Sequence, residues 1–370
     1  MLVNVLVFFG VLSLLVLVHE LGHFFVAKRA GIWVEEFGFG LPPRLWGKKF
    51  GQTIFSLNLL PFGGFVKLHG EGSDEGLSKP KRAFLNKSKK VRVAVLLAGV
   101  LMNFLLGIVA FAIVYSFSGV PKETENVRVI EVAVGSPAQT GGLIVGDVIR
   151  KIGGNDVRST GAFIQEVDRF RGKNVVLDVE SDATGRAETR RVSVKPREEP
   201  PSGEGPLGVA ISTVEIYYPP IWQRPFYGVY FGFKDAVYWG KTVVSGIFQI
   251  FTDISAGQAP KDLAGPVGIF ALTSEVYKVG VLALINFIGI LSVNLAILNI
   301  IPFPALDGGR LLFVALESIF GRKILPRVEA AVHTVGMIIL LILIFAITAR
   351  DIRGLISAGS ISGFLEGVLR

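Results

Sequence analysis

Cysteine is absent from the 370-residue chain, and histidine occurs only four times. The absence of cysteine excludes disulfide bonds, thiolate metal sites and cysteine nucleophiles. Any metal site must therefore be built from imidazole and carboxylate groups, so few residues can contribute to it. The four histidines are His19, His23, His69 and His333.

Charged residues are also scarce. They make up 18% of the chain, against roughly 25% in an average soluble protein, while 51% of the residues are hydrophobic. This composition indicates an integral membrane protein with the lipid bilayer as its first partner. A net charge of +8 is compatible with nucleic-acid binding, but basic loops facing the cytoplasm are the commoner cause in a membrane protein. We expect no nucleic-acid partner.

Four segments approach the length of about 20 apolar residues that a membrane-spanning helix needs. The first is interrupted only by His19, Glu20 and His23, and it lacks the basic start of a signal peptide, so we expect it to be retained. The expected fold is a polytopic α-helical membrane protein. Its expected spans are Leu2–Ala27, Val93–Pro121, Val279–Leu306 and Ala330–Ala349.

Lysine and arginine are concentrated in the loop between the first two spans. The positive-inside rule places this loop in the cytoplasm and the N-terminus outside. The sequence HELGH, residues 19–23, then lies towards the cytoplasmic end of the first span. Asp307, at the end of the third span, is expected at the same depth.

The cytoplasmic loop contains an apolar, alternating run at residues 52–70, which is typical of β-strands. Pro61 and the pair Gly63-Gly64 are expected to break it into separate strands. Because the run is too apolar for a solvated loop, we expect a membrane-associated β-hairpin within residues 32–70.

Residues 126–198 are charged and contain short β-like runs. Within them, GSPAQTGGLIVGDVIRKIGGNDV (135–157) resembles the core of a PDZ domain, the alternative being a generic small β domain. The expected division of the chain is residues 1–121 with two spans and the β-hairpin, 122–215 with an extracytoplasmic PDZ domain and linker, 216–278 as an interfacial amphipathic segment, and 279–370 with two spans.

The HELGH motif predicts a metal site. Residues four apart share one face of a helix, so His19 and His23 can bind one ion, and zinc suits two imidazoles. Glu20 is placed to take a proton from a water molecule on that ion, as in the HExxH metallopeptidases. Three ionisable groups within an apolar span are costly unless they serve a function.

A catalytic zinc ion normally has three protein ligands. Asp307, in NIIPFPALDGGR (299–310), is the best candidate for the third, because Pro302 and Pro304 prevent a regular helix there. The alternative is an aspartate that merely ends a helix. His69 lies in the basic loop and His333 stands alone in the fourth span, so both are weaker candidates.

HELGH on the first span, paired with Asn-x-x-Pro-x-Pro-x-Leu-Asp-Gly late in the chain, resembles the site-2 protease family of intramembrane zinc metalloproteases. FGGFVKLHGE (62–71) resembles the membrane-embedded β segment of that family. The four spans and the single PDZ domain are most similar to the bacterial regulator-of-sigma-E type, which implies a location in the bacterial inner membrane.

The resemblance implies Zn2+ bound by His19, His23 and Asp307, with Glu20 as catalytic acid and base. Asn294 and Asn299 would lie near the substrate. The chain departs from the family pattern at Val100, where a proline is common, so local bending of the second span is uncertain.

The resulting hypothesis is an intramembrane zinc metalloprotease acting on single-pass, previously trimmed membrane proteins, such as anti-sigma factors or signal-peptide remnants. An edge strand within residues 52–69 would bind the substrate as an added strand, and the PDZ domain would gate access. The alternatives are a non-catalytic membrane scaffold built around the PDZ domain, and a zinc transporter.

Overall fold

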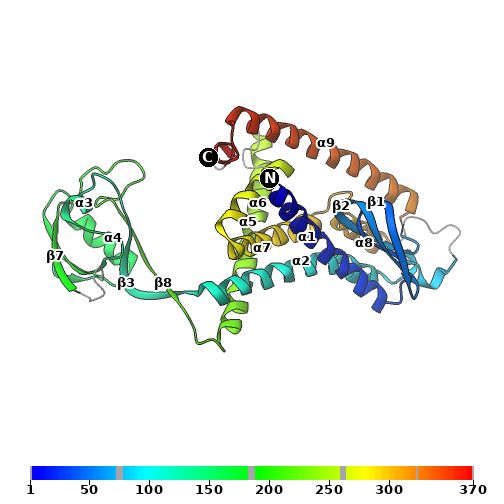
Figure 1. The fold of residues 1–370 in the computed structure, drawn as a ribbon, viewed down its shortest axis with the longest axis horizontal. Coiled ribbons are helices and arrows are strands. Elements are labelled where there is room, and N and C mark those ends of the chain that lie inside the picture. The colour runs from blue at the N-terminus through cyan, green and yellow to red at the C-terminus, as the bar shows by residue number, and fades with distance from the viewer. Residues whose placement is uncertain (1, 72–77, 182–187, 259–263, 322–323, 369–370) are drawn as a thin grey trace. The chain divides into compact units, whose positions relative to one another are not determined.

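The computed structural model describes residues 2–71, 78–181, 188–258, 264–321 and 324–368. The chain divides into two compact units (Figure 1). The first combines Met1–Ser118 with Trp222–Arg370, and the second is Gly119–Ile221. The second unit, which we call the insert, therefore interrupts the first in sequence.

Four helices of the described residues are long and apolar enough to cross a membrane, as expected: α1 (Leu2–Arg29), α2 (Lys89–Ser118), α7 (Val281–Ile300) and α9 (Pro326–Ala358). At a rise of 1.5 Å per residue, about 20 residues span the hydrocarbon core. The third was expected to continue to Leu306, but it ends at Ile300, because Pro302 and Pro304 cannot continue the hydrogen-bonding pattern of a helix.

Two helices occupy most of the segment expected to be interfacial, α5 (Arg224–Ser255) and α6 (Pro266–Val279). α5 packs on α2 through a stripe of small residues, since a Cβ atom at Gly232 would lie 2.7 Å from the Ile108 carbonyl oxygen. Its opposite face exposes aromatic side chains such as Phe226, Tyr230 and Phe233. α5 is not among the candidate spans of the described residues.

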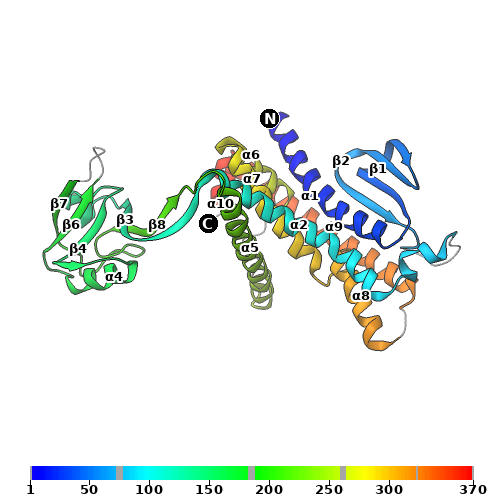
Figure 2. The same cartoon turned by 90° about the horizontal axis from the view of Figure 1, so that it is seen from below.

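Strands β1 (Val34–Phe50) and β2 (Thr53–Leu68) form a sheet beside α1 (Figure 2). β2 pairs with β1 in three places: residues 53–58 with 44–50, residues 54–57 with 36–39, and residues 64–68 with 34–39. Four backbone segments therefore lie side by side, in the order 64–68, 34–39, 53–58 and 44–50. β2 passes from the interior of the sheet, at residues 53–58, to its edge, at residues 64–68. The change occurs around Pro61 and the Gly63-Gly64 pair, where the sequence predicted that the strand would be broken.

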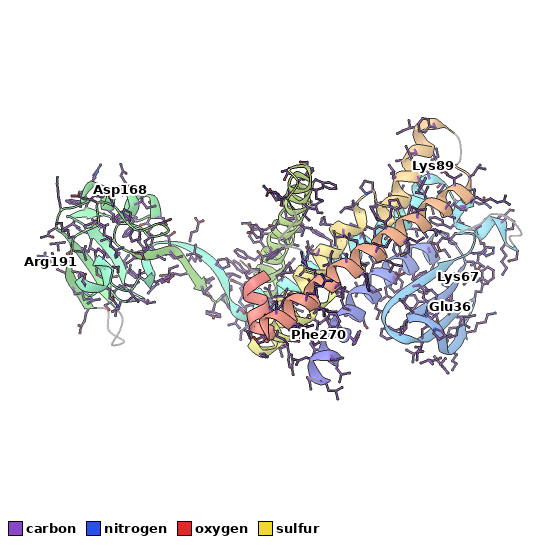
Figure 3. The ribbon with its side chains drawn as sticks, turned by 90° about the horizontal axis from the view of Figure 1, so that it is seen from above. Glu36, Lys67, Lys89, Asp168, Arg191 and Phe270 are labelled. Carbon is purple, nitrogen blue, oxygen red and sulfur yellow. The ribbon has the colours of Figure 1, made fainter. Side chains whose placement is uncertain are left out.

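The sheet carries charged side chains on one side and joins the helices on the other. Glu36 and Lys67, on neighbouring strand segments, are labelled in Figure 3. A cluster of buried apolar residues connects the sheet with α1, α2 and α8 (Asp307–Phe320). Its members are Ala27, Ile32, Val34, Leu68, Phe84, Leu85, Val95, Leu96 and Val314.

A buried ion pair also fixes α8 against α2. Arg92 Nη1 donates to Glu317 Oε2 at 2.7 Å, and both side chains are 3% exposed. Lys89 Nζ donates to the Glu317 carbonyl oxygen at 2.8 Å. Because breaking a buried pair leaves an uncompensated charge, this contact strongly favours one position for α8. The remaining elements of this unit are two 3-10 turns, Pro80–Arg82 and Phe84–Asn86, and α10 (Ile361–Val368).

The insert forms a six-stranded antiparallel sheet in the order β7-β6-β4-β3-β8, with β5 paired to β4. Its elements are β3 (Val120–Val132), α3 (Pro137–Gly141), β4 (Val148–Ile152), β5 (Asn155–Asp156), α4 (Thr160–Arg169), β6 (Val175–Ser181), β7 (Glu188–Val194) and β8 (Val209–Tyr217). Ser136 and Ser159 cap the two helices through their side chains. The insert has an apolar core of its own, consistent with its division from the rest of the chain as a compact unit.

Candidate metal centre

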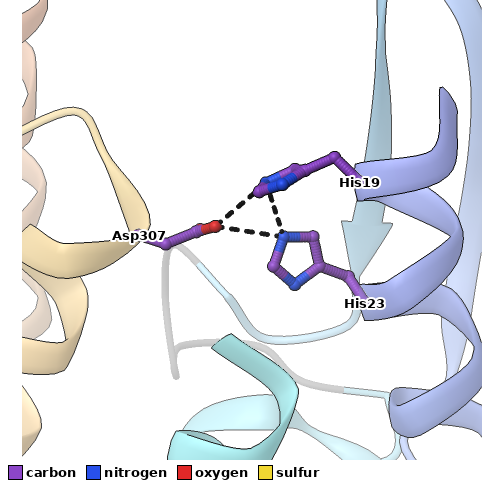
Figure 4. A group of neighbouring side chains, drawn as sticks. All are labelled: His19, His23 and Asp307. Carbon is purple, nitrogen blue, oxygen red and sulfur yellow. Dashed lines mark hydrogen bonds and ion pairs between the residues drawn. The ribbon is translucent and has the colours of Figure 1, made fainter. Parts of the chain in front are cut away.

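Among the described residues, one group of His, Asp and Glu side chains brings its ligand atoms close enough to share an ion: His19, His23 and Asp307 (Figure 4). The two Nε2 atoms lie 3.1 Å apart. Asp307 Oδ2 lies 3.0 Å from Nε2 of His19 and 3.2 Å from Nε2 of His23. The three atoms therefore form a nearly equilateral triangle.

The hydrogen bond of His23 determines which of its nitrogens can bind a metal. Nδ1 lies 2.8 Å from the Val95 carbonyl oxygen. Because a carbonyl only accepts, Nδ1 carries the proton, and the neutral ring presents a lone pair at Nε2. This lone pair faces Asp307 Oδ2, a buried acceptor that no donor of the described residues satisfies. Two acceptors held this close repel each other unless a metal ion or a proton lies between them.

The triangle fits zinc. In a tetrahedral site with ligands at about 2.0–2.1 Å, neighbouring ligand atoms lie about 3.3 Å apart. The distances here are 3.0, 3.1 and 3.2 Å. Two imidazoles and one carboxylate also form a known ligand set of catalytic zinc, which keeps a fourth position open for water or substrate.

α1 and α2 position the two histidines. His19 and His23 lie one helical turn apart on the face of α1 that packs on α2. A Cβ atom at Gly99 would lie 2.7 Å from Cε1 of each imidazole, so any larger residue would displace both rings. α2 is continuous from Lys89 to Ser118, so the replacement of a proline by Val100 leaves a regular helix.

The loop after α7 positions Asp307. Residues 301–306 are non-helical, and α8 begins at Asp307 itself. A Cβ atom at Gly308 would collide with the carbonyl groups of Ile300 and Ile301, so glycine allows α8 to start directly against the end of α7. The positive end of the helix dipole also favours a carboxylate at this position.

Glu20 lines a cavity of about 320 Å3 together with the three possible ligands. It is not a member of the ligand triangle. The other walls come from α7 and from the end of β2, including Phe65 and Leu68. A carboxylate beside the possible metal and open to a cavity has the position that a general base requires.

The edge of the β-sheet faces this cavity. The Val66 N–H hydrogen-bonds Glu20, and the Leu68 N–H donates to Glu71 Oε2 at 3.2 Å. On an edge strand, every second residue points its N–H and C=O groups away from the neighbouring strand. Because Gly64 lies two residues before Val66, its backbone polar groups also point away from β1. Ser56 and Leu57, in contrast, pair on both sides and belong to the interior of the sheet.

An ion pair connects this edge to α8. Arg310, three residues after Asp307, donates to Glu71 Oε1. Glu71 therefore contacts both α8 and the last residue of β2. Arg310 and Glu71 also line the cavity. Their ion pair therefore links the strand edge to the helix that carries Asp307.

The remaining predicted residues are Asn299, Asn294 and His69. Asn299 lines the cavity, whereas Asn294 is half-buried and is not among the lining residues. His69 lies outside the ligand group, and its Nδ1 is 2.7 Å from Glu35 Oε1. Burial raises the pKa of Glu35, but hydrogen bonds from His69 and Lys67 outweigh this effect and lower the pKa overall.

Three residues at the site were missed in the sequence: Asn103, Glu71 and Arg310. Asn103 is fully buried on α2, and its amide nitrogen lies 3.4 Å from His19 Nδ1. Its Oδ1 has no donor among the described residues. Asn103 Oδ1 and His19 Nδ1 are both satisfied when the amide is turned so that Oδ1 accepts the Nδ1 proton. The Nε2 atom of His19 is then unprotonated and can bind a metal. A lone asparagine in an uncharged span was the available signal.

Membrane-spanning helices that bring an HExxH pair and an aspartate to one point define an intramembrane metalloprotease. The profile of peptidase family M50 matches residues 7–343, and the chain belongs to this family. It is therefore a zinc metalloprotease of the site-2 type. This assignment favours the enzyme over the scaffold and transporter alternatives.

The chain is similar to full-length curated relatives. A protein of Clostridium perfringens with the provisional name zinc metalloprotease is 37% identical over 342 residues, covering 92% of this chain and 96% of the relative. Zinc metalloprotease RasP of Shouchella clausii is 28% identical over 435 residues, covering 96% of this chain and 100% of RasP. The PDZ domain of an SdrC-like protein from Listeria monocytogenes is 23% identical, with a TM-score of 0.21, and covers 24% of this chain and 87% of that domain.

We predict that Asn103→Leu lowers zinc affinity about 10- to 100-fold, the usual cost of losing a group that orients a ligating histidine. Asn103→Asp, which keeps an acceptor for His19 Nδ1, should retain most of the affinity. Competition with a chelator on the purified proteins measures both. Equal affinity in the wild type and Asn103→Leu would show that Asn103 does not orient His19.

Proposed function

We propose that this enzyme cuts peptide bonds within or near the transmembrane segments of other membrane proteins, using the cavity between α1, α7 and β2. The observation that carries the proposal is the convergence of three atoms able to share a metal ion, beside Glu20 and the strand edge 64–68. His19, His23 and Asp307 hold Zn2+, and Glu20 is the catalytic acid and base.

When bound, zinc supplies a Lewis acid that polarises a peptide carbonyl and lowers the pKa of water towards about 7. Glu20 accepts the proton of the attacking water and delivers it to the leaving nitrogen. The hydrogen bond from Val66 orients the Glu20 carboxylate before the reaction. Asn299 also lines the cavity, where its amide can bind the substrate backbone.

A transmembrane helix shields its own amides, so a substrate must unwind before it is cut. The strand edge 64–68 offers replacement hydrogen bonds by strand addition. Its N–H groups at Val66 and Leu68 point away from β1 and now bond Glu20 and Glu71, so an added substrate strand would replace these two side chains as their acceptors. This mode favours substrates rich in residues of low helix propensity, such as glycine and proline.

The proposed orientation has the N-terminus and the insert outside, and the metal centre towards the cytoplasm of a bacterial inner membrane. The basic loop after α1 supports it. The proposed substrates are single-pass proteins already trimmed on the outer side, such as anti-sigma factors or signal-peptide remnants.

The insert is proposed to gate access. A cavity of about 210 Å3 lies between α4 and β8, lined by apolar residues that include Phe163, Val167 and Val209. β8 is the edge of its sheet. An apolar groove along an edge strand suits an extended peptide end, so the insert can select substrates by a newly exposed C-terminus.

Glu20→Gln should abolish cleavage of a model transmembrane substrate while zinc remains bound, because Gln cannot carry the proton. Reconstituted enzyme, gel-based cleavage and metal analysis measure both properties. Glu275→Gln changes a half-buried carboxylate on α6 that pairs with Lys278; it is the matched control and should cut normally. Turnover of the Glu20 variant at the wild-type rate would refute the assignment of the base.

Gly64→Pro should reduce cleavage at least tenfold with zinc content unchanged, because proline removes an outward-facing donor from the strand edge at the cavity. Lys49→Pro is the matched control. It removes an outward-facing donor on the other edge of the sheet, since Phe50 and Thr53 flank the two-residue turn. Equal cleavage by the two variants would argue against strand addition at residues 64–68.

Replacing residues 125–212 by an Asn-Gly turn should leave zinc content and cleavage of trimmed substrates intact. The junction is short, because the Thr124 hydroxyl donates to the Thr213 carbonyl oxygen at 3.1 Å. The variant should also cut substrates with bulky outer domains that the full chain rejects. If both proteins reject a long substrate and accept its short form equally, the insert is not the gate.

A further inference from the structure

The loop that delivers Asp307 contains an unusual backbone conformation. Ala305 has a φ of 82°, and it is the one non-glycine residue with a positive φ among those the structure describes. The left-handed region is unfavourable for a residue with a Cβ atom. Ala305 lies two residues before Asp307, so relaxation of its backbone would move the carboxylate away from the two histidines.

A histidine from another span holds this conformation. The Ala305 N–H donates to His333 Nδ1 on α9 at 2.9 Å. Nδ1 must therefore be unprotonated, and the proton of the neutral ring is on Nε2. Nε2 is buried and has no partner within residues 2–71, 78–181, 188–258, 264–321 and 324–368. An unsatisfied buried donor is destabilising, so packing alone does not account for a histidine here.

The same face of α9 is shaped to fit the loop. Gly336 lies three residues after His333, and a Cβ atom there would lie 2.7 Å from the Pro304 carbonyl oxygen. Phe313 of α8 lies beside the His333 ring, with the ring centroids 5.7 Å apart. Most of α9 is otherwise little buried, with 6% of its most apolar window buried. Its contact with residues 304–305 is therefore local and specific.

We propose that His333 is a positioning residue for the metal centre: it holds Ala305 in the left-handed conformation and thereby fixes Asp307 within the ligand triangle. This inference rests on the proposed role of Asp307 as a ligand. In this way α9, the fourth span, supports the metal centre without contacting the metal.

Zinc affinity, measured by chelator competition on the purified full-length protein, and the initial rate of cleavage test the inference. His333→Ala should lower zinc affinity about 10- to 100-fold, the range for residues that orient ligands. Ala305→Gly should behave as the wild type. The double variant should recover most of the loss, because glycine adopts positive φ without the hydrogen bond. Thr334→Ala, on the exposed face of α9, is the control for a change in this helix.

A second pair of variants serves if His333→Ala does not fold. Asn can place an acceptor oxygen near the position of Nδ1, whereas Gln places its oxygen near that of Nε2. His333→Asn should therefore keep more zinc affinity than His333→Gln. Equal losses in these two, or a double variant no better than His333→Ala, would overturn the proposal.

Asp307→Ala separates this inference from the proposed function. Full zinc affinity in His333→Ala together with a loss in Asp307→Ala would overturn the positioning role alone. Full affinity in both variants would overturn the proposed ligand set as well.

Discussion

The structure depends on one constraint: ionisable groups buried in an apolar helix must be compensated. His23 Nε2 and Asp307 Oδ2 are two acceptors 3.2 Å apart, and His19 Nε2 is the third corner of the same triangle. A metal ion or an added proton shared between these atoms compensates their repulsion. Several contacts around the group hold its three atoms together.

Each proposed ligand is held from outside the centre. Val95 orients His23, Asn103 lies against His19, and His333 supports the loop before Asp307. The ion pair of Arg92 with Glu317 fixes α8 on α2, and that of Arg310 with Glu71 connects α8 to the strand edge. The same helix thus carries a ligand and sets its distance from the place where a substrate strand would add.

The sequence predicted which residues would come together, and not what supports them. HELGH identifies its own face of a helix, and Asp307 was predicted from the broken end of the third span. Hydropathy identified four spans, but the third ended early, because two prolines outweighed apolarity. Which strand forms the edge could not be derived, since the pairing of residues 53–58 on both sides depends on tertiary folding. Asn103 and Arg310 were missed because their roles come from contacts between distant elements.

Zinc K-edge absorption of the purified enzyme in lipid tests the central claim most directly. The account predicts a low-coordinate shell of two imidazole nitrogens and oxygen ligands at about 2.0–2.1 Å. It also predicts loss of the carboxylate oxygen from the spectrum, or of the metal itself, in Asp307→Ala. A shell with three imidazoles, or a spectrum that Asp307→Ala leaves unchanged, would contradict it.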